Sequence, residues 1–140
     1  MTLKQTSILL CRIALFVVYF WFGFLKIIGQ SPASAMVHDL LNQMMPFVSF
    51  PVFIVLFGLF EVLIGLLFII PGLERLAVVL FFLHIFTTAL PLFVLPEVWN
   101  RAFVPALEGQ YIIKNLALVA CVVTIYSSVS TRKSKYSGTI

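Results

Sequence analysis

Charged residues are scarce in this sequence. Asp, Glu, Lys and Arg make up only 10% of the 140 residues, whereas hydrophobic residues make up 62%. An average soluble domain is about half apolar and about a quarter charged. Too few polar side chains are therefore present to cover a surface in contact with water. The composition excludes an ordinary soluble domain and indicates that lipid is the main solvent of the protein.

Basic surfaces and cysteine motifs are also missing. The formal net charge is +4, but most basic residues stand singly at the ends of apolar segments and form no basic face, so we expect no binding to nucleic acid. The one basic cluster, Arg132, Lys133 and Lys135, follows the last apolar segment and is typical of an anchor beside the cytoplasmic face of a membrane. The two cysteines, Cys11 and Cys121, form no CxxC motif and are interpreted as packing residues.

Catalytic motifs are absent as well. The sequence contains no recognisable pair of nucleophile and base, no phosphate-binding loop and no dinucleotide fingerprint. His84 has no second histidine, cysteine or carboxylate at metal-ligand spacing, so we predict no metal site. The lack of these motifs favours a role other than catalysis.

What the sequence does contain is four apolar segments of membrane-spanning length. They cover residues 7–28, 50–70, 75–95 and 110–128. A span needs roughly 20 apolar residues, and backbone groups in lipid must be satisfied within the segment, so each segment is predicted to be a helix. Pro71-Gly72 predicts a tight turn between the second and third helices. We therefore predict an all-α, polytopic membrane protein in which residues 1–140 form one domain, an antiparallel bundle of four transmembrane helices.

Two of the connections carry further signals. Residues 32–45 are predicted to form a short helix in the membrane interface, with Ser31 as N-cap and Pro32 at the first helical position. The side of this helix that is expected to face the membrane consists of Val37, Leu40, Leu41 and Met44. The last connection is predicted to be a loop whose Trp99 and Phe103 lie at the level of the lipid headgroups.

The distribution of Lys and Arg predicts the orientation of the bundle. With the N-terminus inside, the basic residues at the inner side are Lys4, Arg12, Arg75, Arg132, Lys133 and Lys135, and those at the outer side are Lys26, Arg101 and Lys114. Because basic residues accumulate in cytoplasmic connections, both termini are expected in the cytoplasm. A cleaved signal peptide is the alternative, since Ala33-Ser34-Ala35 resembles a cleavage site. The first apolar segment is longer than a signal peptide requires and contains Arg12, which argues against cleavage.

Each predicted spanning helix carries polar and small residues on one face. By helical spacing, these faces contain Arg12, Tyr19, Gly23 and Lys26 in the first helix, Gly58, Glu61 and Gly65 in the second, His84, Thr87 and Thr88 in the third, and Gln110, Lys114, Ala117, Cys121 and Thr124 in the fourth. Polar side chains within a membrane normally face the bundle interior, so we expect all four faces to point inward. The candidate residues for ligand binding or proton relay are Glu61, His84, Lys114, Lys26, Arg12, Tyr19, Gln110 and Asn115.

Glu61 is the only acidic residue deep in a predicted span. At a rise of about 1.5 Å per residue, Glu61 and His84 lie near the middle of the bilayer, whereas Lys114 lies roughly 6 to 8 Å and Lys26 about 13 Å toward the outside. A buried carboxyl must be neutral or paired, so His84 and Lys114 are its predicted partners. Two interpretations stay open. Glu61 ties the helices together, or Glu61 and His84 form a site that binds a polar ligand or carries protons.

Three short motifs stand in the predicted helices. They are Arg12, Phe22-Gly23 and Lys26 in the first helix, Glu61 and Gly65 in the second, and Glu108-Gly109-Gln110-Tyr111-Ile112-Ile113-Lys114-Asn115-Leu116 at the start of the fourth. With these motifs the chain resembles the DoxX-like superfamily of small four-helix membrane proteins over about residues 12–126. The resemblance implies a four-helix bundle in the bacterial inner membrane. Proteins of this kind include a subunit of a thiosulfate:quinone oxidoreductase and others linked to oxidative stress, so the resemblance also implies a role near redox chemistry, and it carries over no catalytic residue.

The sequence is compatible with three functions. The first is a small accessory subunit or binding protein linked to redox or respiratory chemistry, whose partners are the lipid bilayer and a membrane redox protein. The second is a stand-alone quinone-dependent oxidoreductase or a binder of a small amphipathic molecule. The third is a proton-coupled transporter that works as a homo-oligomer, with Glu61 and His84 as its relay. The residues themselves indicate no cofactor, and a quinone is an expectation from the resemblance alone.

Overall fold

The fold is an all-α bundle. The computed structural model describes residues 1–137, and the surroundings of the side chains for residues 1–130. Its α-helices are α1 (Leu3–Ile27), α2 (Ser34–Met44), α3 (Phe50–Ile69), α4 (Glu74–Ala89), α5 (Pro91–Val94) and α6 (Leu107–Ser137). Four segments are long and apolar enough to cross a membrane, with α4 and α5 forming one of them. The predicted bundle of four transmembrane helices is confirmed, while the basic side chains of Arg132, Lys133 and Lys135 lie outside the described residues.

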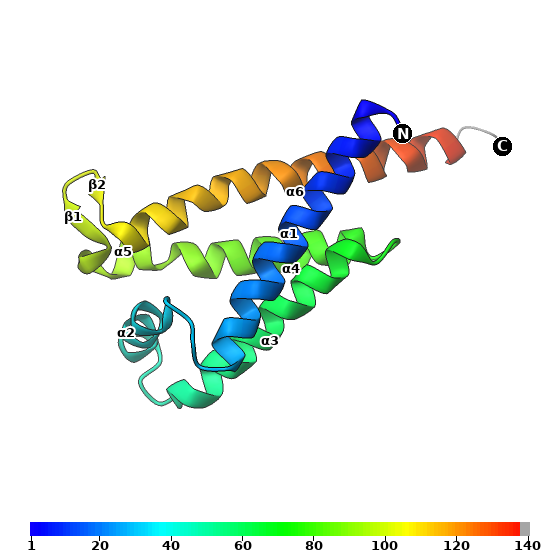
Figure 1. The fold of residues 1–140 in the computed structure, drawn as a ribbon. Coiled ribbons are helices and arrows are strands. Elements are labelled where there is room, and N and C mark those ends of the chain that lie inside the picture. The colour runs from blue at the N-terminus through cyan, green and yellow to red at the C-terminus, as the bar shows by residue number, and fades with distance from the viewer. Residues whose placement is uncertain (138–140) are drawn as a thin grey trace.

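The four spanning segments are arranged as two antiparallel pairs (Figure 1). Helix α1 packs along α3, and this contact is the most extensive in the molecule. Helix α4 lies beside α6, and α6 also packs against α1. The pairs converge at the end that carries both termini and diverge toward the other end, where α2 lies (Figure 1). An even number of spans places both termini on the same side of a membrane.

Several helix ends differ from the predicted boundaries. Helix α1 begins at residue 3 because Thr2 forms a capping box: its side chain accepts a hydrogen bond from the Gln5 backbone N–H, and the Gln5 side chain accepts one from the Thr2 N–H. The third span is interrupted, since α4 ends at Ala89 and Pro91 has no N–H to continue the helical ladder. The last helix begins at Leu107 and continues past the predicted end at residue 128.

Helix α2 forms where a short helix was predicted, but its start and its orientation differ. It begins at Ser34 with Ala33 as N-cap, so the predicted N-cap at Ser31 is wrong. The Ser31 hydroxyl instead accepts a hydrogen bond from the Ala33 N–H at 3.3 Å, which forms a turn before the helix. Leu41 is buried against the protein and does not face the membrane, because α2 packs against α3 and α5.

The connection from α5 to α6 has more structure than the predicted loop. Its elements are a 3₁₀ turn (Pro96–Val98) and the two strands β1 (Trp99–Arg101) and β2 (Val104–Pro105) of an antiparallel hairpin. The Trp99 indole N–H donates a hydrogen bond to the Leu92 carbonyl at 3.0 Å and thereby attaches the hairpin to α5. Phe103 occupies the hairpin turn with a φ of 61°, and its side chain is almost fully exposed.

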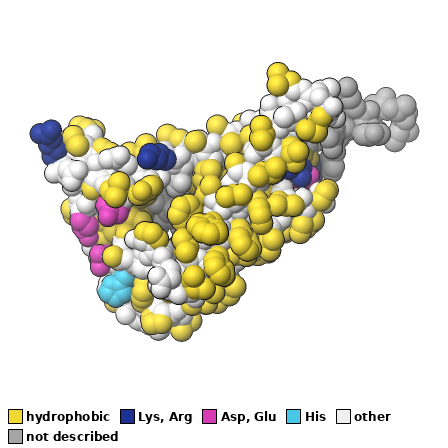
Figure 2. All heavy atoms as spheres, viewed as in Figure 1, with side chains coloured by type: hydrophobic (Ala, Val, Ile, Leu, Met, Phe, Trp, Pro, Cys, Tyr) yellow, Lys and Arg dark blue, Asp and Glu magenta, His cyan; other side chains and the backbone are white. Residues whose placement is uncertain are grey.

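The apolar core lies where the helix pairs converge. Its fully buried side chains include Leu15 of α1, Ile64 and Phe68 of α3, Phe81 of α4, and Val122 and Ile125 of α6. Large apolar side chains also cover the outside of the spanning helices, and in Figure 2 they extend over most of the visible body, while charged side chains appear mainly toward the ends. Such a surface suits lipid contact along the spans and water contact at the ends.

Candidate functional site

The site begins with the close contact between α1 and α3. A Cβ atom at Gly23 would lie 2.6 Å from the Gly58 carbonyl oxygen, and one at Gly58 would lie 2.6 Å from the Gly23 carbonyl oxygen. Both distances are far below ordinary van der Waals contact, so only glycine permits the two backbones to approach this closely. The contact fixes the register of the two helices and places Lys26 of α1 against Gly58 of α3.

This register brings Lys26 to Glu61. The Lys26 Nζ atom lies 2.7 Å from Glu61 Oε2, and both side chains are about 6% exposed. The sequence-based depth estimate had placed Lys26 well outside the middle of the bilayer. The depth of Lys26 was counted along its own helix, without the register of α1 against α3. In the bundle Lys26 packs against Gly58, which lies one turn before Glu61. The long, flexible lysine side chain covers the distance of that one turn and reaches the Glu61 carboxylate.

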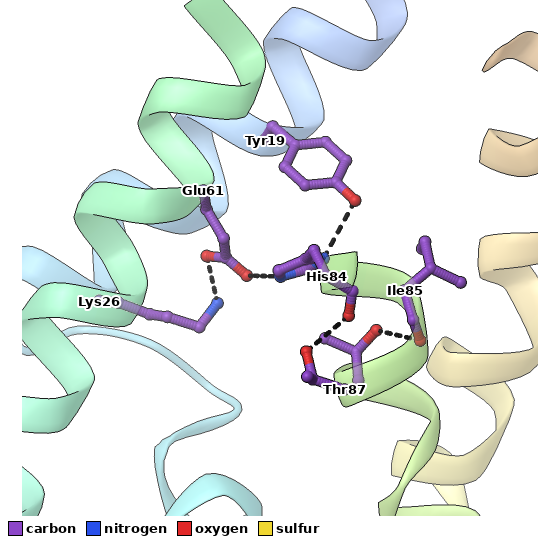
Figure 3. A network of polar contacts seen from close by, with 7 residues as sticks. Tyr19, Lys26, Glu61, His84, Ile85 and Thr87 are labelled. Atoms are coloured by element: carbon purple, nitrogen blue, oxygen red, sulfur yellow. Dashed lines mark hydrogen bonds and ion pairs between the residues drawn. The ribbon is translucent and has the colours of Figure 1, made fainter. Parts of the chain in front are cut away.

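His84 of α4 contacts the other oxygen of the same carboxylate. Its Nε2 atom lies 2.9 Å from Glu61 Oε1, which confirms the predicted pairing of these two side chains. The Nδ1 atom of His84 lies 3.0 Å from the Tyr19 hydroxyl of α1. Tyr19, Lys26, Glu61 and His84 are therefore joined in one network, in which Figure 3 shows the side chains of three helices meeting. We call these four side chains the polar network.

The hydrogen bonds of the polar network have a definite direction. A carboxylate only accepts hydrogen bonds, so Lys26 Nζ and His84 Nε2 both donate to Glu61. In a neutral imidazole the other ring nitrogen is then an acceptor, and the Tyr19 hydroxyl donates to it. The chain of donors runs from Tyr19 through His84 to Glu61, and the charge of Glu61 is balanced by Lys26. Every member is at most 6% exposed.

Aromatic rings line the polar network, and they were not among the predicted site residues. The Phe57 ring stacks on His84 at a centroid distance of 5.2 Å and also lies 5.6 Å from Lys26 Nζ. Phe60 lies 6.2 Å from His84, with its ring tilted. A cation over a ring face is attracted by its quadrupole, which holds the ammonium in place. Phe57 could have been found from its position one helical turn before Glu61.

The threonines that follow His84 do not join the polar network. The Thr87 hydroxyl donates to the His84 carbonyl at 2.8 Å, and the Thr88 hydroxyl donates to the Ile85 carbonyl at 3.1 Å. Both hydroxyl groups thus form their hydrogen bonds within α4, as Figure 3 shows for Thr87. Their predicted inward position is only partly met, because both are half-buried.

The predicted inward face of the last helix was wrong except at Cys121, which packs against the apolar core. Lys114 does not pair with Glu61; it is exposed, and its Nζ lies 5.2 Å from the ring of Tyr111 one turn away. Gln110, Ala117 and Thr124 on the same face are also exposed. Helix α6 instead buries its apolar side, including Val122 and Ile125, against α1 and α4. Helical spacing identified the polar face correctly but not the direction in which it points.

Two further candidates lie apart from the polar network. The Arg12 guanidinium forms an ion pair with Glu74 and a hydrogen bond to the Phe68 carbonyl, at the end of the bundle where the helices converge. Asn115 is half-buried on α6. Arg12 therefore connects α1 to the end of α3 and the start of α4 and forms no hydrogen bond or ion pair with Glu61.

The two cysteines lie side by side. Cys11 of α1 and Cys121 of α6 are close enough for their thiols to interact, and both pack against the apolar core. Their predicted role as packing residues agrees with their position against the core, but their proximity to each other was not predicted. No spacing in the sequence indicates this contact, because it depends on how α6 crosses α1.

The chemistry of the site is that of proton exchange and polar binding. Within the part of the chain that the structure describes, no three His, Cys, Asp or Glu side chains are grouped closely enough to hold a metal ion. The polar network instead offers an ammonium, an imidazole, a carboxylate and a phenol in mutual contact. Searches against protein-family models, curated proteins and solved structures found no match to this chain.

Proposed function

We propose that the protein is a small, non-catalytic membrane protein linked to redox or respiratory chemistry, and that its polar network binds and exchanges protons with a small amphipathic molecule. The ligand class that fits best is a quinone. The proposal includes membership of the DoxX-like superfamily and a place in the bacterial inner membrane with both termini in the cytoplasm. It rests on the site chemistry together with the sequence resemblance and the basic residues near the helix ends.

A single observation carries this proposal. Four ionisable side chains from three helices form one continuous, buried chain of hydrogen bonds inside a membrane-spanning bundle. A charged side chain within a span costs roughly 2.5 to 3.5 kcal/mol to insert, so such residues mark ligand or proton pathways more often than they serve stability. The ion pair of Lys26 and Glu61, which an apolar pair could replace, is consistent with a functional role.

The arrangement suits a ligand with carbonyl oxygens. An ammonium has three N–H groups, and among the described residues Lys26 donates one hydrogen bond, to Glu61. Reduction of a quinone to a quinol adds two electrons and two protons. The Lys26 ammonium is the group with N–H groups to spare, and Glu61 and His84 can pass protons on to it. The electrons would come from a redox partner protein in the membrane. This division of roles favours an accessory binding protein over a stand-alone oxidoreductase.

The decisive variant removes the ionisable pair while keeping the fold. Lys26→Met combined with Glu61→Leu leaves no unpaired charge, so the protein should insert and fold. If the proposal is correct, this double variant loses the quinone that copurifies with the wild type in mild detergent. It should also fail to restore growth under oxidative stress to a strain that lacks the protein. Quinone content is measured by extraction and mass spectrometry, normalised to folded protein.

A control and a second test variant sharpen the experiment. Glu74→Gln removes the carboxylate that pairs with Arg12, which lies outside the polar network, and should keep both ligand and activity. Glu61→Gln keeps the shape of Glu61 but not its charge, and should lose ligand per folded molecule. If the folded double variant retains quinone and full activity, the polar network serves only to hold the helices together. The same conclusion follows if the wild-type protein copurifies with no amphipathic ligand.

A further inference from the structure

A second feature of the bundle lies away from the polar network, on the membrane-facing side of α4 and α6. A groove of about 550 Å³ runs between these helices, lined from α4 by Arg75, Val79 and Phe82 and from α6 by Val123 and Tyr126, among others. Because the two helices are antiparallel, Arg75 and Tyr126 both lie toward the end that carries the chain termini. Phe82 lies two helical turns further in, roughly 10 Å along the axis.

Arg75 is a free cation at the mouth of this groove. Its side chain is exposed, and among the described side chains it has neither an ion pair nor a hydrogen-bond acceptor. The neighbouring Glu74 carboxylate is already paired with Arg12. The groove therefore presents an unneutralised guanidinium at the membrane surface and a wall of valine and phenylalanine side chains that extends into the bilayer.

We propose that this groove binds an anionic phospholipid from the leaflet beside the chain termini. The phosphate of the lipid pairs with Arg75 and one acyl chain lies along Val79, Phe82 and Val123. Basic pockets between transmembrane helices bind anionic headgroups in this manner, and a guanidinium matches the geometry of a phosphate through two parallel N–H groups. The Tyr126 ring stands at the same level and provides the amphipathic contact that aromatic residues make at the interface. The apolar groove and the positive charge at its mouth therefore favour an anionic phospholipid. This proposal does not depend on the ligand of the polar network.

The test compares lipid retention by native mass spectrometry after reconstitution with phosphatidylglycerol or phosphatidylcholine. The wild type should retain phosphatidylglycerol in preference to phosphatidylcholine. Arg75→Gln should weaken retention of phosphatidylglycerol roughly fivefold, the factor that corresponds to one basic residue near a membrane surface, and leave phosphatidylcholine unchanged. Arg101→Gln is the matched control, because Arg101 is exposed at the opposite end of the bundle and should have no such effect.

A second variant tests the apolar part of the site without touching the charge. Val79→Trp fills the groove from an exposed position and should displace the acyl chain, so retention of phosphatidylglycerol should fall although Arg75 is intact. Equal loss in Arg75→Gln and Arg101→Gln would overturn the proposal, because the attraction would then be unspecific. Unchanged retention in Val79→Trp would overturn it too. A copurifying protein that protects the groove from lipid would show that the occupant is a partner and not a phospholipid.

Discussion

Helices α1 and α3 touch through their backbones, whereas α4 and α6 are separated along one side by a groove. The first pair is joined by the reciprocal contact of Gly23 and Gly58 and by the buried ion pair of Lys26 and Glu61. Within residues 1–130 the second pair has neither feature, and the polar side chains of Gln110, Lys114 and Thr124 on α6 are exposed. Within lipid, close packing and polar contacts hold helices together, because apolar surface gains nothing by leaving lipid. We therefore expect the α1–α3 pair to be the rigid part of the molecule and the α4–α6 pair to be the adaptable part.

The largest effect is expected from breaking the ion pair on one side only. Lys26→Met leaves Glu61 buried without its ammonium, and removing one partner of a buried pair costs about 3 to 5 kcal/mol. The double variant Lys26→Met with Glu61→Leu should recover most of this stability. Melting in mild detergent measures both.

The matched control for this cycle is Lys114→Met. Lys114 is an exposed lysine in the other helix pair, and surface substitutions of this kind change stability by about 0.5 kcal/mol or less. If the single and double variants at residues 26 and 61 lose equal stability, the two charges are not coupled. The ion pair would then not contribute to the difference in rigidity between the two helix pairs.

A smaller, graded effect is expected from the glycines. Gly23→Ala and Gly58→Ala each place a methyl group against a backbone oxygen that cannot move aside, and overpacking of this kind costs about 1 to 3 kcal/mol. Gly65→Ala should cost less, because its Cβ would lie 3.1 Å or more from its nearest neighbours. Thermal unfolding of the three variants measures the order. Equal losses at all three positions would mean that the α1–α3 contact is looser than described.

Much of this comparison could be anticipated from the sequence. The lengths of the apolar segments gave the four spans, because a helix in lipid has few alternatives. The pairing of Glu61 with His84 followed from their similar depths, since both lie near the middle of their spans. Spacing also placed Gly58, Glu61 and Gly65 on one face of α3, and all three are buried.

The choice between Lys26 and Lys114 could not be made in that way. It depends on the register of α1 against α3, which the Gly23–Gly58 contact sets, and on the rotation of α6 about its own axis. A polar stripe on an amphipathic span has the same spacing whether it faces the bundle or lies outside it. For α6 the apolar residues around Val122 and Ile125 fit the core better than the stripe that contains Lys114.

The smallest expected effect comes from the two cysteines, which lie where α1 of the first helix pair meets α6 of the second. Cys11 of α1 and Cys121 of α6 lie close enough to interact, so mild oxidation with diamide should bridge them within one molecule. The measurement is a gel shift with a maleimide-linked polymer after denaturation, which should show that both thiols are lost in monomeric protein. In Cys121→Ser, the remaining Cys11 should stay reactive. Bridging only between different molecules would show that α6 does not cross α1 as described.

The ion pair between Lys26 and Glu61 also bears on how the chain enters the membrane. The two residues belong to spans that leave the ribosome at different times, with α2 between them. Each span alone carries a charge into lipid, at a cost of roughly 2.5 to 3.5 kcal/mol, until its partner arrives. We therefore expect α1 to remain beside the insertion machinery until α3 has been synthesised. Biogenesis of this small protein should then proceed by helix pairs, with α1 and α3 released into the bilayer as one unit.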